Sequence, residues 1–396
     1  MNLALKVRLG ALPVASTQIH SLMVVAGEAS GDMHAAKVIE TLLKKNKKLK
    51  IFGLGGPLMA KAGMEVREDL TRQALIGFWE VLKHYPVIRR RFADCEKWLG
   101  NEKPDLLFLV DYPGFNLRLA ERAHKTGVPV CYYVAPKVWA WNKNRVKTMK
   151  RIIRKLLVIF PFEIDFFKKH GIEATYVGNP LIEEMDLKPI QRKEVLGQYG
   201  IKLSRFPIVC AMPGSRKGEI EKIWPLFLKA SRILRKSCPD AAFVIPKSQG
   251  LEHGDFTGLT PEDPFFFVDG PAYHLRQACD VAWIKSGTST LETALLETPM
   301  VVVYKVAAMT GFLVKRLLKI KNVSLVNILA GQTVVTELLQ EKAKPKKLME
   351  ETNRILDQKD FRDRQIRAFR KIKKDISRPS KSSVKVAEEI LKLLKG

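Results

Sequence analysis

The amino-acid sequence repeats one pattern along most of its length: a short, wholly apolar run, then a glycine-rich loop, then an amphipathic stretch. The pattern first occurs at "SLMVVAGEASGD" (residues 21–32), and the following "HAAKVIETLLKKNK" has apolar residues at helical spacing. It recurs at "KIFGLGGPLMAKAG" and at "PDLLFLVDYPGFNLRLAERAHKTG". Wholly apolar strands that alternate with helices predict βαβ units and a parallel sheet covered by helices on both faces.

A second series with the same pattern begins near residue 206 and includes "FPIVCAMPGSRKGEI", "AAFVIPKSQ" and "DVAWIKSGTSTLETALLETP". A chain of 396 residues is too long for one ordinary hydrophobic core, and a polar, proline-bearing stretch over residues 180–204 separates the two series. We therefore predict an α/β fold with two Rossmann-like domains whose parallel sheets face each other across a cleft. The expected limits are residues 1–21 for an N-terminal extension, 22–185 and 186–360 for the two domains, and 361–396 for a basic helical segment that packs back on either domain.

The chain is strongly basic, with 68 Lys and Arg against 41 Asp and Glu and a net charge of +27. Such an excess favours an anionic partner, which could be nucleic acid, an anionic membrane surface or a phosphorylated substrate. The alternative is a cationic surface that serves only solubility. The basic residues cluster over residues 143–155 ("KNRVKTMKRIIRK"), where no acid occurs, and again over residues 361–396.

The cysteines and the apolar runs limit the class of protein further. Five cysteines lie far apart with no CxxC pair, which predicts reduced thiols, no zinc site and no disulfide framework. No apolar run reaches the roughly 18 residues that a membrane-spanning helix needs. The first 21 residues weakly resemble a signal peptide, but Lys6, Arg8 and Pro13 interrupt their apolar part. We expect a soluble chain with a frayed N-terminal extension, no metal site and no cofactor.

Two loops in the second half place glycine and hydroxyl residues at the expected start of a helix. In "GSRKGEIEK" (residues 214–222), Arg216 can donate two hydrogen bonds to a phosphate. In "KSGTSTLETAL" (residues 285–295), Ser286, Gly287 and Thr288 present N–H and hydroxyl groups. The first loop alone could be a simple N-cap with Arg216 in solvent, but two anion-binding helix N-termini in one domain fit a nucleotide diphosphate.

Glu292 lies one turn into the second of these helices. Its carboxylate could accept hydrogen bonds from the vicinal hydroxyls of a ribose. The pattern GxxxxGK[ST] is absent, and "GLGGPLMAKAG" does not have the spacing of GxGxxG. These motifs therefore disfavour ATP hydrolysis and dinucleotide binding.

The first half offers carboxylates at two strand ends. Asp111 ends the run "LLFLVD", and the loop "GEASGD" follows the first strand. Ligands of open parallel sheets bind beyond the carboxyl ends of the strands, so both loops should face one crevice. A carboxylate there can act as a general base towards a sugar hydroxyl, and Asp111, Glu28 and Asp32 are all open candidates. The alternative for Asp111 is an Asx-turn ahead of a proline and a glycine. The residues that we expect in the acceptor loop are Glu28, Ser30, Gly31 and Asp32.

Taken in order, several motifs closely resemble the lipid-A-disaccharide synthase family of inverting glycosyltransferases, which has the GT-B architecture. The resemblance covers nearly everything from residue 23 to about residue 340. The motifs are "VAGEASGD", "GLGGPLM" with "GFWEVLKH", "PDLLFLVDYPGFN", "PKVWAWNKNRV", "PGSRKGEI", "SGTSTLETAL", "PMVVVYK" and "VSLVNILAG".

The resemblance implies a reaction and assigns roles to residues. UDP-2,3-diacylglucosamine would donate its sugar to the 6-hydroxyl of 2,3-diacylglucosamine 1-phosphate, giving a β-1,6-linked disaccharide 1-phosphate and UDP. Asp111 falls on the family's candidate catalytic carboxylate, Arg216 and Asn327 on other functionally important positions, and Glu292 on the usual ribose-binding position. The residues that we expect to contact UDP are Gly214, Ser215, Arg216, Glu219, Ser286, Gly287, Thr288, Glu292 and Asn327.

The resemblance also implies a location and partners. It suggests a cytoplasmic enzyme, peripheral on the inner face of the inner membrane of a Gram-negative-type bacterium, and a homodimer that exchanges C-terminal segments. We expect the basic stretches "KNRVKTMKRIIRK" and "FLVKRLLKIK" to dock on anionic phospholipid, where each Lys or Arg contributes about 1 kcal/mol. The expected membrane contacts are Lys143, Arg145, Lys147, Lys150, Arg151, Lys315 and Arg316.

The chain departs from the family at one position, and other functions stay open. The family commonly has a histidine after glycine near the domain connection, where this chain reads "VGNPL" with Asn179. The nearest alternative is another two-domain UDP-sugar enzyme, such as a muramyl-peptide N-acetylglucosaminyltransferase or a UDP-N-acetylglucosamine 2-epimerase. A nucleic-acid-binding protein would explain the charge, but no RNP, KH or helix-turn-helix signature occurs, so we expect no nucleic-acid partner.

Overall fold

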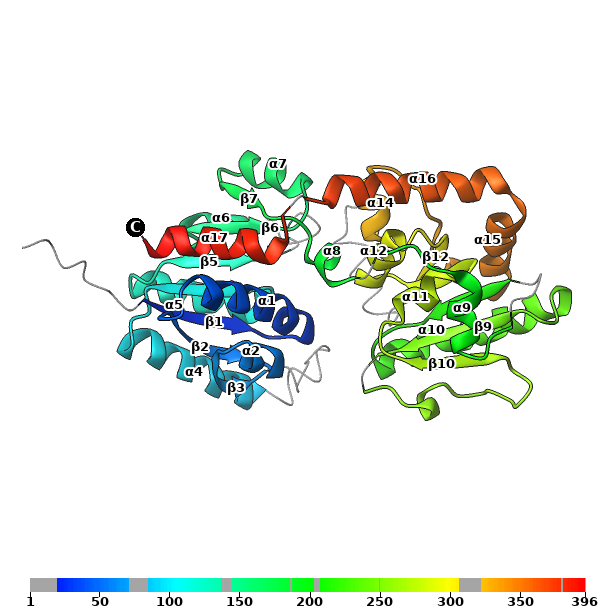
Figure 1. Ribbon diagram of the computed structural model, residues 1–396, viewed down its shortest axis with the longest axis horizontal. Helices are drawn as coiled ribbons and strands as arrows, with labels where there is room; N and C mark the ends of the chain where they lie inside the picture. The colour runs from blue at the N-terminus through cyan, green and yellow to red at the C-terminus, as the bar shows by residue number, and fades with distance from the viewer. Residues whose placement is uncertain are drawn as a thin grey trace, which may run out of the picture. The chain divides into compact units, whose positions relative to one another are not determined.

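The computed structural model describes residues 20–70, 85–136, 138, 144–185, 187–202, 207–248, 250–305, 322–378 and 380–395 (Figure 1). These residues form two sheets with helices between successive strands, and every strand pairing whose register is given is parallel. The predicted α/β class is therefore confirmed.

The N-terminal sheet has seven strands in the order β3-β2-β1-β4-β5-β6-β7. Its strands are β1 (Ser21–Ala26), β2 (Lys50–Gly55), β3 (Glu65–Asp69), β4 (Leu106–Val110), β5 (Val130–Tyr133), β6 (Lys155–Val158) and β7 (Ala174–Tyr176). The helices of this part of the chain are α1 (Ala29–Lys45), α2 (Pro57–Lys61), α4 (Tyr85–Asn101), α5 (Pro113–Lys125), α6 (Asn144–Ile152), α7 (Phe162–Lys169) and α8 (Pro180–Glu184). The central strand β4, "LLFLV", is buried at every residue, as a strand covered on both faces must be.

The C-terminal sheet has six strands in the order β10-β9-β8-β11-β12-β13. Its strands are β8 (Ile208–Met212), β9 (Ala242–Lys247), β10 (Phe265–Asp269), β11 (Val281–Lys285), β12 (Met300–Tyr304) and β13 (Glu337–Leu339). The helices are α9 (Arg192–Gln198), α10 (Lys217–Ser237), α11 (Tyr273–Gln277), α12 (Thr288–Leu295), α14 (Leu325–Ala330), α15 (Pro345–Asp357), α16 (Lys359–Ile376) and α17 (Ser382–Leu394), with 3₁₀ turns at η2 (His253–Asp255) and η3 (Gln340–Lys342).

Strand β11 shows how both faces of the C-terminal sheet are covered. Val281 and Trp283 pack into one hydrophobic cluster, whereas Ala282 and Ile284 pack into the other. Because successive side chains of a strand point to opposite faces, one strand contributes to both clusters. The indole N–H of Trp283, which is fully buried, donates to Thr352 Oγ1 at 2.9 Å and so satisfies its polar group.

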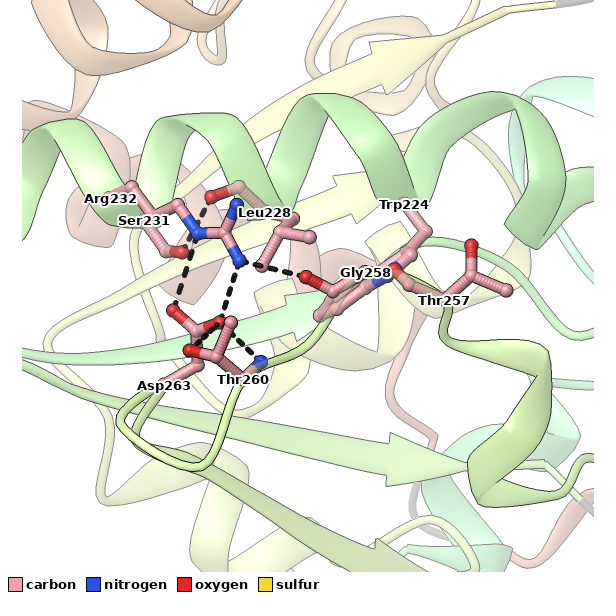
Figure 2. Close-up of polar contacts among 8 residues, drawn as sticks. All are labelled: Trp224, Leu228, Ser231, Arg232, Thr257, Gly258, Thr260 and Asp263. Atoms are coloured by element: carbon pink, nitrogen blue, oxygen red, sulfur yellow. Dashed lines mark hydrogen bonds and ion pairs between the residues drawn. The ribbon is translucent and has the colours of Figure 1, made fainter.

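Helix α10 holds the long connection between β9 and β10 in place (Figure 2). The Trp224 indole N–H donates to the Thr257 carbonyl at 2.8 Å. Arg232 donates to the Gly258 carbonyl at 2.7 Å and to Asp263 Oδ2 at 2.8 Å. The hydrogen bond from Arg232 lowers the pKa of the Asp263 carboxyl despite its partial burial, so this carboxylate stays charged near neutral pH. The connection is therefore part of the folded domain.

The chain divides into two compact units. The first comprises residues up to Pro136, Ile152–Leu156 and Val386–Gly396, and the second comprises Lys137–Arg151 and Leu157–Lys385. Most of α17 thus belongs to the first unit, where Glu389 pairs with Lys155 of β6 at 2.9 Å and Glu388 with Lys45 of α1 at 3.4 Å. The domain limits expected from the sequence remain predictions.

Candidate active site

Each sheet reverses its strand order once, and most of the predicted catalytic and UDP-binding residues follow the strands at these two reversals. In the first sheet the chain runs from β1 to β2 and β3 on one side and then returns to β4 on the other side of β1. In the second sheet β8 and β11 have the same relation. Open α/β sheets bind ligands at the carboxyl ends of the strands where the order reverses. We call the ends of β1 and β4 the N-terminal switch point, and the ends of β8 and β11 the C-terminal switch point.

At the N-terminal switch point the two carboxylate-bearing loops touch each other. Ala26 and Val110 are register partners at the ends of β1 and β4, so the residues that follow them emerge side by side. A Cβ added to Gly27 would lie 2.3 Å from the Tyr112 ring, so only glycine allows this close approach. The sequence-based expectation that both loops share one edge of the sheet agrees with this geometry.

The backbone at Asp111 is strained and held from several sides. Asp111 and Tyr112 have φ angles of 49° and 47°, in the left-handed region that costs a non-glycine residue about 1–3 kcal/mol. The Asp111 carbonyl accepts hydrogen bonds from Asn116 Nδ2 at 2.8 Å and from the Tyr132 hydroxyl at 2.5 Å, and its N–H donates to the Tyr133 carbonyl at 3.0 Å. Strain that neighbouring groups hold in place is typical of functional sites.

A third strained residue lies on the adjacent strand and was missed by the sequence analysis. Val134, directly after β5, has a φ of 61°, which is a marked outlier for a β-branched side chain. Strands β4 and β5 are neighbours in the sheet. No residue type in "YYVAP" signals this conformation, because nothing in a valine favours a positive φ.

Asp32 has a structural task at the same switch point. Its side chain is 2% exposed, and its carboxylate accepts hydrogen bonds from the backbone N–H groups of Gly56 at 2.9 Å, Leu58 at 3.1 Å and Met59 at 3.0 Å. These are unpaired N–H groups at the start of α2, which a carboxylate stabilises. Both oxygens of Asp32 are therefore occupied in this structure.

The other residues of the "GEASGD" loop lie at the start of α1. Glu28 is the N-cap residue of α1 and is half-buried. The pKa of the Tyr112 hydroxyl is raised, first by burial and then by the charge of Glu28, while Arg91 lowers it by a smaller amount. Ser30 is exposed and Gly31 is buried. Glu28 thus contributes negative charge beside Asp111.

At the C-terminal switch point one carboxylate joins the two predicted phosphate loops. Glu219 Oε2 accepts a hydrogen bond from the Ser215 N–H at 2.9 Å, and Oε1 pairs with Arg216 Nη1 at 3.3 Å and with Lys285 Nζ at 2.7 Å. Gly214 has a φ of 149°, and a Cβ there would lie 2.5 Å from Glu219 Cβ. Glycine is therefore required where the loop passes Glu219.

The charges at this switch point favour an anion. Burial raises the pKa of Glu219, but the hydrogen bond and charge of Lys285, together with Ser215 and Arg216, lower it overall. Glu219 was expected to contact UDP; in this structure its carboxylate pairs with Arg216 and Lys285. Lys285 was not among the expected binding residues, and its only signal was its place at the end of the run "VAWIK".

The loop after β11 starts α12 as the sequence predicted. Gly287 is the N-cap residue, no side chain caps the helix there, and Thr288 is exposed. Ser286 is buried, and its N–H donates to the Val303 carbonyl at 2.9 Å. The uncapped N–H groups at the start of α12 are suited to bind an anion.

Glu292 is oriented by a buried arginine that the sequence did not reveal. Arg276, 1% exposed, donates to Glu292 Oε2 at 2.8 Å and to Thr293 Oγ1 at 2.7 Å. Among the described residues Glu292 Oε1 has no hydrogen-bond partner, so it can accept one from a ligand. Burial and then the Glu292 charge raise the pKa of nearby Tyr273 to about 12.

Asn327 braces a loop and offers nothing to a ligand in this structure. It is 0% exposed, and its Nδ2 donates to the Val335 carbonyl at 2.9 Å and to Glu337 Oε1 at 2.8 Å. Its Oδ1 accepts from the N–H groups of Val334 and Val335 at 2.7 and 2.9 Å. An amide has two donors and two acceptor sites, and all are used. Its expected contact with UDP therefore has no support in this geometry.

Two further groups of residues were singled out in the sequence: the expected membrane contacts, and Asn179, where the family commonly has a histidine. Helix α6 exposes Lys147, Lys150 and Arg151, while Arg145 is half-buried. Lys143, Lys315 and Arg316 lie outside the described residues. Asn179 caps α8, because its Oδ1 accepts from the Leu181 N–H at 3.1 Å.

In the part of the chain that the structure describes, no helix has both the length and the apolar character needed to cross a bilayer. The same residues contain no group of three or more His, Cys, Asp or Glu side chains placed to hold a metal ion.

Two Rossmann-like sheets with loops of this kind define the GT-B class of glycosyltransferases and related nucleotide-sugar enzymes. The UDP-GlcNAc 2-epimerase from Neisseria meningitidis shares the fold with a TM-score of 0.57 at 13% identity, over 95% of this chain and 99% of that one. The MurG protein of Acinetobacter baumannii does so with a TM-score of 0.53 at 14% identity, over 94% and 99%.

Within that class, the chain belongs to the lipid-A-disaccharide synthetase family, whose model matches residues 22–391. It is 40% identical over 341 residues to the lipid-A-disaccharide synthase of Geobacter sulfurreducens, covering 85% of this chain and 88% of the relative. It is 36% identical over 380 residues to that of Myxococcus xanthus, covering 94% and 97%. The family and the enzyme class, a hexosyltransferase, were thus correctly predicted.

Proposed function

We propose that the protein transfers the diacylglucosaminyl group of UDP-2,3-diacylglucosamine to the 6-hydroxyl of 2,3-diacylglucosamine 1-phosphate. Membership of the family implies a UDP-sugar donor and a lipid-phosphate acceptor. The observation that carries the proposal further is the contrast between the switch points. One has carboxylates at the ends of β1 and β4, and the other has cations and helix N-termini at the ends of β8 and β11.

In this proposal Asp111 is the general base. Its carboxylate takes the proton of the acceptor 6-hydroxyl while that oxygen attacks the anomeric carbon of the donor. The bond from the anomeric carbon to the diphosphate oxygen breaks, and UDP leaves with the electron pair. Attack opposite the leaving group inverts the configuration and gives the β-1,6 linkage. The restraint on the Asp111 backbone supports this role, since a base needs a fixed position.

UDP would bind at the C-terminal switch point. Arg216 and Lys285 supply positive charge to the diphosphate, and the N-termini of α10 and α12 supply N–H groups. Glu292, oriented by Arg276, accepts a hydrogen bond from the ribose. The expected contacts of Gly214, Ser215, Ser286, Gly287 and Thr288 remain part of this proposal.

The test is a glycosyl-transfer assay in mixed micelles with EDTA, with wild type and Asp111→Asn side by side. We expect disaccharide and UDP from the wild type, and at least ~100-fold less turnover from the variant, the size of a general-base contribution. No product from the wild type would reject these substrates in favour of another UDP-sugar reaction. Near-normal turnover of the variant would instead move the base to Glu28.

The location is a separate part of the proposal. We infer peripheral binding to the anionic inner face of the inner membrane, with Lys147, Lys150 and Arg151 of α6 as contacts, because their side chains are exposed and the helix carries no acid. Flotation with anionic and neutral vesicles tests it. Reversal of these three charges should abolish preference for anionic vesicles, whereas reversal of three exposed basic residues on α16 (Arg364, Arg367 and Lys374) should not.

A homodimer that exchanges C-terminal segments also belongs to the proposal. Such an exchange would transfer to a partner the ion pairs that Glu389 and Glu388 of α17 form with β6 and α1. Sedimentation equilibrium of the full chain tests the dimer. A monomer at all concentrations would reject it.

A further inference from the structure

Helices α4 and α5 enclose a cavity that the proposed mechanism does not use. Its volume is about 780 Å³, within the range of about 300–1,000 Å³ that small-molecule sites occupy. Tyr112 and Gly114, one and three residues after Asp111, line one part of it. The cavity therefore begins beside the candidate base and extends along α5.

One end of the cavity is apolar and aromatic. It is formed by Ile88 and Phe92 of α4 and by Tyr112 and Phe115 at the start of α5. The rings of Phe92 and Phe115 pack edge to face with centroids 5.4 Å apart, and those of Tyr112 and Phe115 stack at 5.7 Å. Such a lining accepts hydrocarbon and excludes water.

The rest of the lining is charged, with four cations and one acid, Glu121. Arg118, Arg122 and Lys125 follow one another at helical spacing on α5, and Arg89 faces them from α4. Arg122 pairs with Glu96 at 2.7 Å. Arg89, Arg118 and Lys125 are exposed and have no ion-pair partner among the described residues. Three unpaired cations beside an apolar cavity suit an amphiphile with an anionic head, whereas an ordinary solvated helix face would have no cavity beside it.

We propose that this cavity is the acceptor subsite, in which an acyl chain packs on the aromatic end and the 1-phosphate binds to Arg118 and Arg89. The inference rests on the proposed function, because the acceptor is the substrate that carries both groups. The 6-hydroxyl, carried on C5 through C6, and the 1-phosphate, carried on C1, both project from the carbons that flank the ring oxygen. A base directly before α5 and a cation within the first two turns of α5 can therefore contact the same sugar.

Gly114 permits a direct test by filling the cavity. A Cβ at Gly114 meets no atom within 4 Å, and the same holds for Gly100 on α4, which does not line the cavity. Gly114→Leu and Gly100→Leu are therefore a matched pair of helical substitutions that should both fold. A second pair is Arg118→Glu in the cavity and Arg90→Glu outside it, where the Arg90 side chain is 82% exposed.

Initial rates of the full-length enzyme would be measured in mixed micelles with each substrate varied in turn. We expect Gly114→Leu and Arg118→Glu each to raise the KM for the acceptor at least ~10-fold, the effect of losing one charge-assisted contact or the apolar volume. The KM for the donor and the Kd for UDP should stay at the wild-type value. Gly100→Leu and Arg90→Glu should match the wild type throughout.

An unchanged acceptor KM in both cavity variants would overturn the proposal. Loss of binding to phosphatidylglycerol vesicles with an unchanged acceptor KM would also overturn it, and would assign the cavity to a bilayer lipid instead. If the wild type fails to make disaccharide, the proposed function fails separately. Calorimetry with dodecyl phosphate then tests the cavity alone: at least ~10-fold weaker binding by Gly114→Leu than by Gly100→Leu supports an amphiphile site, and equal binding excludes one.

Discussion

At the ends of β1 and β4 the N-terminal sheet carries carboxylates on a strained backbone, whereas at the ends of β8 and β11 the C-terminal sheet carries cations and helix N-termini. Both places arise from the same reversal of strand order. The comparison teaches that topology provides the location, and that the residues in the following loops decide its charge. The proposed proton acceptor and the proposed diphosphate site are thus built from one architecture.

The largest effect should come from the buried support of the C-terminal switch point. Arg276→Met leaves the Glu292 carboxylate without its partner, which should cost about 3–5 kcal/mol of unfolding free energy, as for other broken buried ion pairs. Urea denaturation measures it. Adding Glu292→Gln removes the stranded charge and should restore part of the loss, while a double variant no more stable than Arg276→Met would contradict the assignment.

The second prediction separates chemistry from binding. Asp111→Asn should lose at least ~100-fold in turnover with an unchanged Kd for UDP. Arg216→Ala should weaken UDP binding ~10-fold or more, since a hydrogen bond to a charged group contributes about 1.5–3 kcal/mol. Calorimetric titration measures the Kd for UDP of both variants, and the glycosyl-transfer assay measures their turnover. If either variant changed the turnover and the Kd for UDP by the same factor, the result would contradict the division of roles between the two switch points.

The glycines of the two switch points give a third prediction. Gly27→Ala would press on the Tyr112 ring, and Gly214→Ala would press on Glu219 at a φ that disfavours alanine. Each should lower stability by about 1–3 kcal/mol. Gly218→Ala, early in α10 with no atom within 4 Å of the new Cβ, is the control and should stabilise by about 0.5–1 kcal/mol. Thermal unfolding measures the stability of all three variants. Equal changes in all three would contradict a special requirement for glycine at positions 27 and 214.

Asp32 tests whether one carboxylate of the N-terminal switch point is purely structural. Asp32→Asn weakens three hydrogen bonds at the start of α2 and should cost about 1 kcal/mol of unfolding free energy. Denaturant unfolding provides the measurement. A variant as stable as the wild type would mean that this carboxylate does not hold α2.

The smallest expected effect is a pH dependence at Glu219. Its folded-state pKa is lowered, so its contribution to stability is present above the unfolded value of about 4.3 and is lost as the pH falls through the folded pKa. Glu219→Gln should therefore show a shallower loss of stability on acidification below about pH 4.3 than the wild type. Parallel acid unfolding curves for both proteins would contradict this.

Much of the fold could be predicted because its strands are locally encoded. Runs such as "LLFLV" and "VAWIK" are too apolar to lie anywhere but inside a covered sheet, and the glycine-rich loops after them mark the strand ends. The loops that hold Asp111, Gly214 and Gly287 were found in the same way. The family followed from the order of these motifs and was confirmed by the match to residues 22–391.

The roles of individual side chains could not be predicted in the same way. Asp32 and Glu219 looked like ligand-facing carboxylates in the sequence, but one holds α2 and the other joins two loops. Asn327 resembled a binding residue and is fully used inside the domain. Each of these contacts joins residues that are close in space through the fold, so no local pattern contains them.

The sequence by itself determined the two parallel sheets, the loops at their carboxyl ends and the family, since these depend on apolar runs, glycine positions and motif order. Only the tertiary structure decided that Arg276 supports Glu292, that Lys285 joins the phosphate loops and that α4 and α5 enclose a cavity beside Asp111. The physical reason is that hydrogen bonds, ion pairs and cavities depend on which chain segments meet, and that is set only when the strands take their order in the sheet.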